Sequence, residues 1–320
     1  MLEKILRQVI LGQDISRKEA EFLISVDLQQ LKQAANQIRE HFCGNKFDLC
    51  SIINGKSGRC SEDCKYCGQS IHYQTKINIY DLLEKEVIEN MAIHNANQGV
   101  GRFSIVTSGR CLNNEEFTKI IEIYKHLNEN VKISLCASLG LLTKEQFISL
   151  KSAGVKRYHN NLETSRSYFT KICTTHSYDQ KIKTIKEAKK AGLEICSGGI
   201  MAMGESWDDR LDLAFELKNL GVNSIPINIL NPISGTPLQG CKPLAKEEIE
   251  RIMAIFRFIH PSAVLRMAGG RGLLKDKGMS VYKSGGNGAI TGDMLTTQGI
   301  TIAEDQKLIK MLGFKVNNYD

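Results

Sequence analysis

The chain has 320 residues, a length that suits one large α/β domain and does not require two. Hydrophobic residues make up 42% and charged residues 24%, which indicates a folded globular protein rather than a disordered chain. The net charge of +7 is spread over predicted helices, so a nucleic-acid-binding surface is not expected. No apolar run is long enough to span a membrane, and residues 1–16 do not resemble a secretory signal, so we expect a cytoplasmic location.

Short apolar segments with strand character alternate with longer helical segments along the chain. Residues 1–42 are predicted to form an N-terminal helical extension, and residues 43–320 a barrel domain. The predicted strands cover residues 48–53, 102–107, 131–136, 155–160, 193–199, 224–230, 263–268 and 288–291. The clearest predicted helices cover residues 80–98, 114–130, 143–154 and 207–221. Eight such alternations predict an α/β fold, a (β/α)8 TIM-type barrel, whose active site lies where strands end and loops begin.

Three glycines divide helix patterns from the strands that follow them. Gly154, Gly192 and Gly221 each stand at such a boundary, where a glycine commonly ends a helix.

The most specific local motif is a cysteine cluster directly after the first predicted strand, Cys60-Ser-Glu-Asp-Cys64-Lys-Tyr-Cys67. Three thiolates at this spacing can bind three irons of a [4Fe-4S] cluster and leave the fourth iron free for another ligand. A structural zinc site usually takes four protein ligands, and no fourth candidate stands nearby at zinc-like spacing. With ten cysteines and an expected reducing compartment, metal ligation is favoured over disulfides.

Further segments follow in a characteristic order: RYHNNLETS, ICSGGIMAMGES, SIPINILNPISGTPL, LRMAGGR and ITGDMLTT. Together with CSIINGKSGRCSEDCKYCGQS, they resemble segments of the biotin synthases, a family of radical S-adenosylmethionine (SAM) enzymes. The resemblance runs from about residue 40 to the C-terminus. It implies a sulfurtransferase that abstracts hydrogens from two unactivated carbons of dethiobiotin and inserts one sulfur, taken from an auxiliary iron–sulfur cluster.

The resemblance also implies the residues that hold SAM and its cluster. Cys60, Cys64 and Cys67 match the cluster ligands. The positions that match SAM-binding residues are Tyr66, Asn161, Glu163, Lys181, Gly198, Gly199 and Ile200. The family usually has Asp at the position of Glu163 and Arg at that of Lys181, and a lysine lacks the planar fork with which arginine binds a carboxylate.

Substrate positions follow from the same resemblance: Asn161, His159, Asn228, Thr296 and Thr297. An asparagine amide can complement both the N–H donors and the carbonyl of a ureido ring, and threonine hydroxyls can bind a carboxylate tail. For His159 a plain core role remains equally open.

The auxiliary cluster is where the sequence departs from the family. Cys136, Cys196 and Arg266 match family ligands, with Arg102 as a neighbour of Arg266, but Ser104 replaces a cysteine that commonly ligates a two-iron cluster. Serine is a poor ligand for such clusters. Cys50 appears on the first predicted strand, and Cys43 lies seven residues earlier. We therefore predict a rebuilt site of Cys50, Cys136 and Cys196, with Cys43 or Arg266 near the remaining position, suited to a four-iron cluster. A degenerate site with Cys50 as a packing residue is the alternative.

Other expected partners also follow from the family: dethiobiotin, SAM, an electron donor such as flavodoxin or ferredoxin, and a second copy of the chain in a homodimer. The alternative enzymes are radical SAM proteins of the hydrogenase-maturation or methylornithine-forming type. A module that only stores iron–sulfur clusters or binds zinc is the alternative from another class. No function is assigned to Cys111, Cys173 or Cys241.

Overall fold

The computed structural model describes residues 1–317. Its helices are α1 (Leu2–Ile10), α2 (Arg17–Ile24), α3 (Leu28–Cys43), α4 (Lys85–Asn97), α5 (Asn114–Asn130), α6 (Lys144–Ser152), α7 (Arg166–Ile172), α8 (Tyr178–Lys190), α9 (Trp207–Asn219), α10 (Lys246–Ile259), α11 (Met279–Tyr282) and α12 (Ile302–Met311), with a 3-10 turn η1 (Arg271–Leu273). Its strands are β1 (Lys46–Lys56), β2 (Arg102–Thr107), β3 (Ser134–Ser138), β4 (Arg157–His159), β5 (Glu194–Cys196), β6 (Gly199–Met201), β7 (Ser224–Ile229), β8 (Val264–Met267), β9 (Gly288–Thr291) and β10 (Lys315–Val316).

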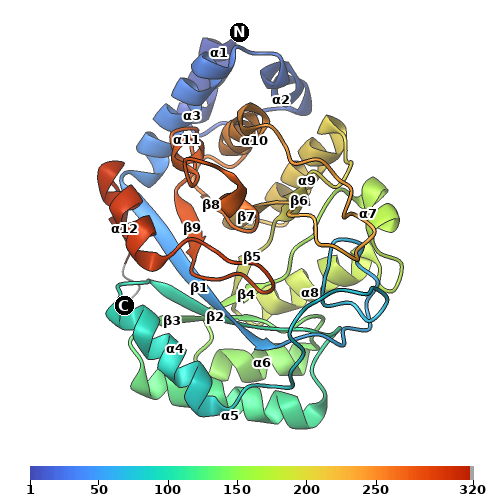
Figure 1. Ribbon diagram of the computed structural model, residues 1–320. Helices are drawn as coiled ribbons and strands as arrows, with labels where there is room; N and C mark the ends of the chain where they lie inside the picture. Colours follow the sequence, from blue (N-terminus) through green and yellow to red (C-terminus); the bar gives the residue numbers. More distant parts are fainter. Residues whose placement is uncertain (318–320) are drawn as a thin grey trace.

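The strands form a closed parallel barrel surrounded by helices (Figure 1). Each strand pairs with the next, and β9 pairs with β1 to close the ring. β5 and β6 both pair with β7 and together fill one barrel position, so the barrel has eight positions. The predicted (β/α)8 fold is confirmed.

Most predicted strands coincide with observed ones, and two differences have local causes. The segment predicted as one strand at 193–199 is divided, because Ser197 and Gly198 separate the end of β5 from the start of β6. The third strand starts at Ser134 rather than at residue 131, since α5 runs to Asn130. The two-residue strand β10, too short to predict, pairs with the start of β1.

Helix boundaries follow from local side-chain chemistry. Asn113 begins α5 with a capping box, in which Asn113 and Glu116 each accept the other's backbone N–H. The predicted glycine boundaries are confirmed, because Gly154, Gly192 and Gly221 have φ values of 95°, 80° and 65°. Only glycine adopts this left-handed conformation easily, and it ends each helix before the next strand.

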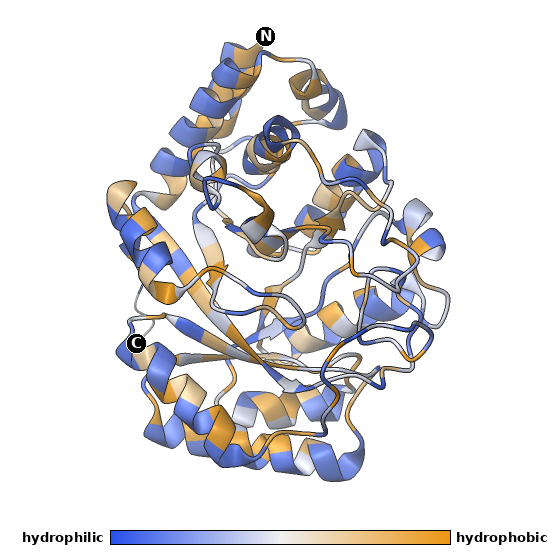
Figure 2. Ribbon diagram, in the orientation of Figure 1, coloured by the Kyte–Doolittle hydropathy of each residue, from blue (hydrophilic) through white to orange (hydrophobic). Residues whose placement is uncertain are grey.

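The three N-terminal helices lie together at one end of the molecule, with α2 and α3 packed against α10 and α1 packed against α3 (Figure 1). Buried apolar side chains of α3 face α10, and hydrophilic residues cover the outer surfaces (Figure 2). Lys32 of α3 binds Glu250 of α10 at 2.5 Å, and Arg251 donates to the carbonyl of Val26 at 2.7 Å. Within residues 1–317, no helix combines the length and apolar character needed to cross a membrane.

Candidate active site

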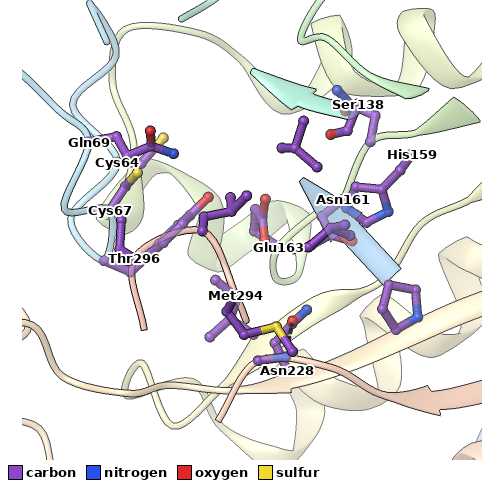
Figure 3. Close-up of a pocket in the computed structure, with 18 of the residues that line it drawn as sticks. Cys64, Cys67, Gln69, Ser138, His159, Asn161, Glu163, Asn228, Met294 and Thr296 are labelled. Atoms are coloured by element: carbon purple, nitrogen blue, oxygen red, sulfur yellow. Dashed lines mark hydrogen bonds between the residues drawn. The ribbon is translucent and has the colours of Figure 1, made fainter. Parts of the chain in front are cut away.

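A cavity of about 410 Å³ opens at the carboxyl ends of the barrel strands, where TIM-barrel active sites lie. In Figure 3, Cys64 and Cys67 lie on one side of it and the strand-end residues Ser138 and His159 on the other, with Glu163 between them. Nearly all predicted site residues line it: Cys50, Cys60, Cys64, Tyr66, Cys67, Cys136, His159, Asn161, Glu163, Lys181, Cys196, Ile200, Asn228, Arg266, Thr296 and Thr297.

The cysteine loop is folded back on itself by backbone hydrogen bonds. The Cys60 N–H donates to the carbonyl of Gln69 at 2.9 Å, and the Cys67 N–H donates to the carbonyl of Cys64 at 2.9 Å. Burial raises the pKa of the Cys60 thiol and that of the Cys67 thiol, the latter to about 11. Both thiols are therefore protonated at neutral pH in the metal-free chain, and metal binding must displace their protons.

Glu163 carries the clearest sign of a ligand position. Its φ of 72° is rare for a residue other than glycine, and such strain is concentrated at functional sites. The backbone is held there because Glu163 N–H donates to the Gly198 carbonyl and the Ile200 N–H donates to the Glu163 carbonyl. Its Oε2 atom is buried without a hydrogen-bond partner, and Lys181 Nζ lies 3.9 Å from Oε1. A buried carboxylate oxygen without a partner indicates a bound donor group, such as an ammonium or hydroxyl.

The glycines of the GG segment are required by protein packing. A Cβ on Gly198 would lie 1.9 Å from the Pro226 carbonyl oxygen, and one on Gly199 would lie 2.5 Å from the Glu163 carbonyl oxygen. Neither glycine lines the cavity, whereas Ile200 does. Gly198 and Gly199 thus let neighbouring backbones approach one another, and their place among the SAM-binding residues stays a prediction.

The barrel interior is built in layers to which alternate strands contribute. Cys50 of β1, Cys136 of β3, Cys196 of β5 and Arg266 of β8 belong to one layer, since β8 occupies the seventh barrel position. All four line the cavity. Ser104, at the position where the family commonly has cysteine, lies on β2 beside them and is buried. The register thus brings together the three thiols that the sequence analysis proposed from separate strands.

Beneath this thiol layer lies a buried carboxylate with three arginines around it. Asp48 accepts from Arg266 at 2.7 Å, and its other oxygen lies 3.3 Å from Arg102 and 3.4 Å from Arg157. Glu194, whose side chain is 55% exposed, contacts Arg157 and Arg102 from the rim. The Asp48 carboxylate holds the pKa of Arg266 above its ordinary value although burial lowers it, so Arg266 stays cationic. Its Nε atom is buried without a partner.

Positive charge favours the thiolate forms of Cys136 and Cys196 in this layer, whereas the hydrogen bond to Cys136 and burial raise the pKa of Cys50. Burial raises the pKa of Cys196, but His159, Arg266 and Arg157 outweigh burial and lower it to about 6. A hydrogen bond from Cys50, aided by Arg157, lowers the pKa of Cys136. His159 thus contacts the Cys196 sulfur as well as the cavity, a role that the sequence analysis did not foresee.

The predicted substrate residues line the cavity, and two of them are also held by the backbone. Asn228 Nδ2 donates to the Gly199 carbonyl at 3.0 Å, and its Oδ1 accepts from the Gly269 N–H at 2.9 Å. Asn161 Oδ1 accepts from the Gly198 N–H at 3.0 Å. The Asn228 amide is therefore fixed in orientation with one N–H and one lone pair left for a ligand, and the Asn161 amide keeps both N–H groups and one lone pair.

Two cysteines lie elsewhere than the sequence suggested. Cys43 ends α3, its Sγ lies 3.5 Å from Arg257 Nη1 and faces the carbonyls of Pro261 and Ala263, and it does not line the cavity. Its predicted place near the auxiliary cluster is corrected, because the chain turns at Gly44 before β1 enters the barrel. Conversely, Cys173, to which no function was assigned, lies beside the cysteine loop, and its Sγ atom is 3.7 Å from the Sγ atom of Cys64.

Comparison with known proteins shows which families the chain resembles. Residues 56–217 match the radical SAM superfamily, and residues 226–315 match the biotin and thiamin synthesis associated domain. The chain is 56% identical to a biotin synthase of Clostridium botulinum over 98% of both chains. It is 53% identical to a biotin synthase of Brachyspira hyodysenteriae over 98% of this chain and 95% of the relative.

Two solved structures of other proteins share the fold. A methylornithine synthase superposes with a TM-score of 0.85 at 17% identity over 98% of this chain and 97% of its own. The hydrogenase maturase HydG also gives 0.85, at 16% identity over 100% of this chain and 76% of its own. At such identities the likeness concerns the fold alone, whereas the sequence relatives share more than half of their residues over nearly their full length. The chain belongs to the biotin synthase family of radical SAM enzymes.

Proposed function

We propose that the chain inserts one sulfur atom into dethiobiotin to form biotin, and that the reaction takes place in the cavity at the carboxyl end of the barrel. The observation that carries this proposal is that two sets of three thiols line one cavity. One set is the Cys60–Cys64–Cys67 loop at the mouth, and the other is the Cys50–Cys136–Cys196 layer in the barrel. The reaction needs one iron–sulfur cluster to cleave SAM and a second to supply sulfur, so two separate sets of thiol ligands suit it.

The loop residues fit a [4Fe-4S] cluster with SAM. Cys60, Cys64 and Cys67 would hold three irons, and the cluster when bound supplies the electron that cleaves SAM reductively. Glu163 offers its unpartnered Oε2 to an ammonium or hydroxyl of SAM. Lys181, 9% exposed at its side chain, supplies a positive charge for the SAM carboxylate as a point charge rather than as a fork. Tyr66 and Ile200 contribute apolar surface to the same cavity.

The layer residues fit an auxiliary cluster. Cys50, Cys136 and Cys196 would ligate it and Arg266 would occupy the fourth position, where its unpartnered Nε suits an anionic group. When bound, this cluster supplies the inserted sulfur. Three thiols without a fourth cysteine, together with the loss of the family's cysteine at Ser104, favour a four-iron cluster over the two-iron type. Cys43 has no part in this set.

Dethiobiotin would bind between the two sets of thiols. Asn228 and Asn161 have amides fixed in orientation at the strand ends, suited to a ureido ring. Thr296 and Thr297, in the loop after β9, would bind the carboxylate tail with their hydroxyls. Exclusion of water by the buried barrel walls would protect a radical formed in this cavity.

Other parts of the proposal rest on the family resemblance. They are a homodimeric assembly and a flavodoxin or ferredoxin as electron donor. A reducing compartment, the cytoplasm, is proposed because thiolate ligands must stay reduced.

Replacing Cys64 with alanine tests the SAM site. We expect the reconstituted variant to release no 5′-deoxyadenosine from SAM while keeping the circular dichroism of the parent. Cys111→Ala, at an exposed cysteine outside the cavity, is the matched control and should behave as the parent does. Release at the parent rate by Cys64→Ala would refute the assignment.

Replacing Asn228 with alanine tests the substrate site. The loss of one buried hydrogen-bonded partner is expected to cost about 1–3 kcal/mol. We expect the KM for dethiobiotin to rise more than the KM for SAM, and thermal unfolding would report the loss of the Gly199 and Gly269 contacts separately. Equal increases in both KM values would contradict the role.

The auxiliary cluster is tested by Mössbauer spectroscopy with iron and sulfide counting on a chain in which Cys60, Cys64 and Cys67 are replaced by alanine. We expect a four-iron signal that disappears on the additional replacement Cys50→Ala. A two-iron signal that Cys50→Ala leaves unchanged would overturn the ligand set.

A further inference from the structure

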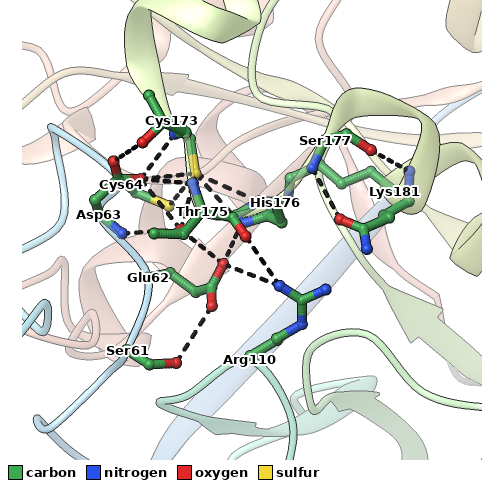
Figure 4. A network of polar contacts seen from close by, with 12 residues as sticks. Ser61, Glu62, Asp63, Cys64, Arg110, Cys173, Thr175, His176, Ser177 and Lys181 are labelled. Atoms are coloured by element: carbon green, nitrogen blue, oxygen red, sulfur yellow. Dashed lines mark hydrogen bonds and ion pairs between the residues drawn. The ribbon is translucent and has the colours of Figure 1, made fainter.

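A second arrangement of metal-ligating side chains shares one cysteine with the SAM-cluster loop. Cys64 of that loop, Cys173 at the end of α7 and His176 three residues later bring one ligand atom each to within 4.8 Å of one another. Figure 4 shows the three residues side by side, surrounded by acidic and hydroxyl groups of both segments. The proposed reaction uses only Cys64 of the three.

Two of the three spacings suit a tetrahedral metal site, and the third pair of ligand atoms, Cys64 and His176, lies within 4.8 Å. With zinc–sulfur bonds of about 2.3 Å and zinc–nitrogen bonds of about 2.0–2.1 Å, neighbouring ligand atoms lie about 3.6–3.8 Å apart. The Sγ atoms of Cys64 and Cys173 are 3.7 Å apart, and Cys173 Sγ is 3.8 Å from His176 Nε2. In the metal-free chain the Cys64–Cys173 contact and the 3.3 Å contact of Cys173 Sγ with His176 Nδ1 hold these groups together, and the convergence of two thiols and an imidazole within 4.8 Å is what suits a metal ion.

Glu62 orients the histidine as outer carboxylates orient metal-bound histidines. The Glu62 carboxylate contacts His176 Nδ1, and both side chains are buried, at 8% and 6% exposure. This contact favours the tautomer with its proton on Nδ1 and its lone pair on Nε2, the form that binds a metal through Nε2. Arg110 lies 3.8 Å from Glu62 and helps to keep this carboxylate ionised.

The neighbouring Asp63 fixes the two segments against each other. Its Oδ1 accepts from the N–H of Thr174 at 2.8 Å and from the N–H of Thr175 at 3.2 Å, and Cys173 Sγ lies at 3.2 Å. The Lys65 N–H donates to the carbonyl of Ile172 at 3.0 Å. These contacts hold Cys173 and His176 in place before any metal arrives, so little ordering entropy opposes binding.

We propose that the cluster-free chain binds one divalent ion of the zinc type at Cys64, Cys173 and His176, with Glu62 as the orienting carboxylate. Thiolate and imidazole ligands favour zinc or ferrous ions over magnesium or calcium. Water fills the fourth position, as at zinc sites with three protein ligands. The site itself does not depend on the proposed reaction. Because Cys64 cannot serve both centres, we further infer that zinc opposes loading of the SAM cluster, and this part rests on the proposed function.

The probe is Co²⁺, followed by its displacement with Zn²⁺, in the full chain stripped of iron and kept reduced under argon. We expect one equivalent of Co²⁺ with an intense sulfur-to-cobalt charge-transfer band, and X-ray absorption of the zinc form with two sulfur ligands and one nitrogen ligand. Cys173→Ala and His176→Ala should each raise the Kd more than about 100-fold, because each removes a ligand. Glu62→Gln should raise it about 10–100-fold.

The main rival site is the three-cysteine loop itself, and a double variant separates the two. Cys60→Ala/Cys67→Ala removes the other loop thiols and leaves the proposed ligands intact, so its Kd should stay within a few-fold of the parent's. Circular dichroism checks that each variant is folded. Loss of Co²⁺ binding in the double variant together with parent-like binding in Cys173→Ala would overturn the proposal, as would the absence of Co²⁺ binding in the parent.

Competition is measured separately. Zinc-saturated parent protein should gain the absorbance of its iron–sulfur clusters more slowly than zinc-free protein, and Cys173→Ala should abolish the difference. Cluster loading that zinc leaves unaltered, with Co²⁺ binding intact, would overturn the shared use of Cys64 and leave the metal site standing.

Discussion

Replacing Asp48 with asparagine tests the electrostatic basis of the thiol layer. The Asp48 side chain is fully buried and lies within 2.7–3.4 Å of three guanidinium groups. Asparagine keeps the shape of the side chain but removes the negative charge that offsets the burial of Arg266 in the thiol layer. Removing one partner of a buried ion pair typically costs about 3–5 kcal/mol, so we expect a loss of stability of that size.

Glu194 provides a matched control because it contacts two of the same arginines. Its carboxylate lies 3.0 Å from Arg157 and 3.5 Å from Arg102, but its side chain is 55% exposed. Exposed ion pairs contribute about 0–1 kcal/mol, so Glu194→Gln should change stability by less than about 1 kcal/mol. The same arginines are thus tested with a buried and an exposed carboxylate.

The assay is urea denaturation of the cluster-free chain, followed by circular dichroism, with the slope m compared between variants. We expect Asp48→Asn to lower the midpoint well below those of the parent and Glu194→Gln, at an unchanged m. Equal midpoints for the two variants would refute the reasoning, as would a loss of unfolding free energy below about 1 kcal/mol for Asp48→Asn. Either result would mean that burial does not determine how much an ion pair stabilises this protein.

Two further predictions concern stability. Burial lowers the pKa of His260, which contacts the Ala214 carbonyl, to about 3, so between pH 3 and 6.5 the unfolded chain binds a proton at this histidine and the folded chain does not. The free energy of unfolding should therefore be highest above about pH 6.5 and fall by up to about 1.4 kcal/mol per pH unit as the pH drops toward 3. The variant His260→Gln should reduce this slope. A slope unaffected by this change would exclude His260 as its source. Gly198→Ala would place a Cβ 1.9 Å from the Pro226 carbonyl oxygen and should lower the Tm by several degrees, whereas Gly240→Ala, with nothing within 4 Å of its Cβ, should not; similar Tm values would contradict the packing role.

The fold was largely predictable because its signals are local. Apolar runs of strand length separated by amphipathic helices, with Gly154, Gly192 and Gly221 at the boundaries, specify the alternation of strand and helix. The thiol layer was also within reach, since Cys136, Cys196 and Arg266 match family positions and Cys50 stands on the first strand. In the observed barrel, the strand register places these residues in one layer.

Features that depend on tertiary contacts could not be predicted. Asp48 is an ordinary residue in the segment DLCSII, and only barrel closure brings three arginines around it. Cys173 approaches Cys64 from 109 residues away, so no spacing motif announces the pair. The positive φ of Glu163 and the outward placement of Cys43 likewise follow from neighbouring segments, since the side chain alone favours neither.

The central claim is tested most directly by following the inserted sulfur. The chain is reconstituted anaerobically with iron and isotopically labelled sulfide, freed of excess sulfide, and mixed with SAM, a chemical reductant and dethiobiotin. Mass spectrometry then measures biotin and 5′-deoxyadenosine. We predict biotin that carries the labelled sulfur, formed only when SAM is cleaved, and no biotin from the variant Cys50→Ala/Cys196→Ala. Release of 5′-deoxyadenosine without any biotin, or biotin with unlabelled sulfur, would contradict the account.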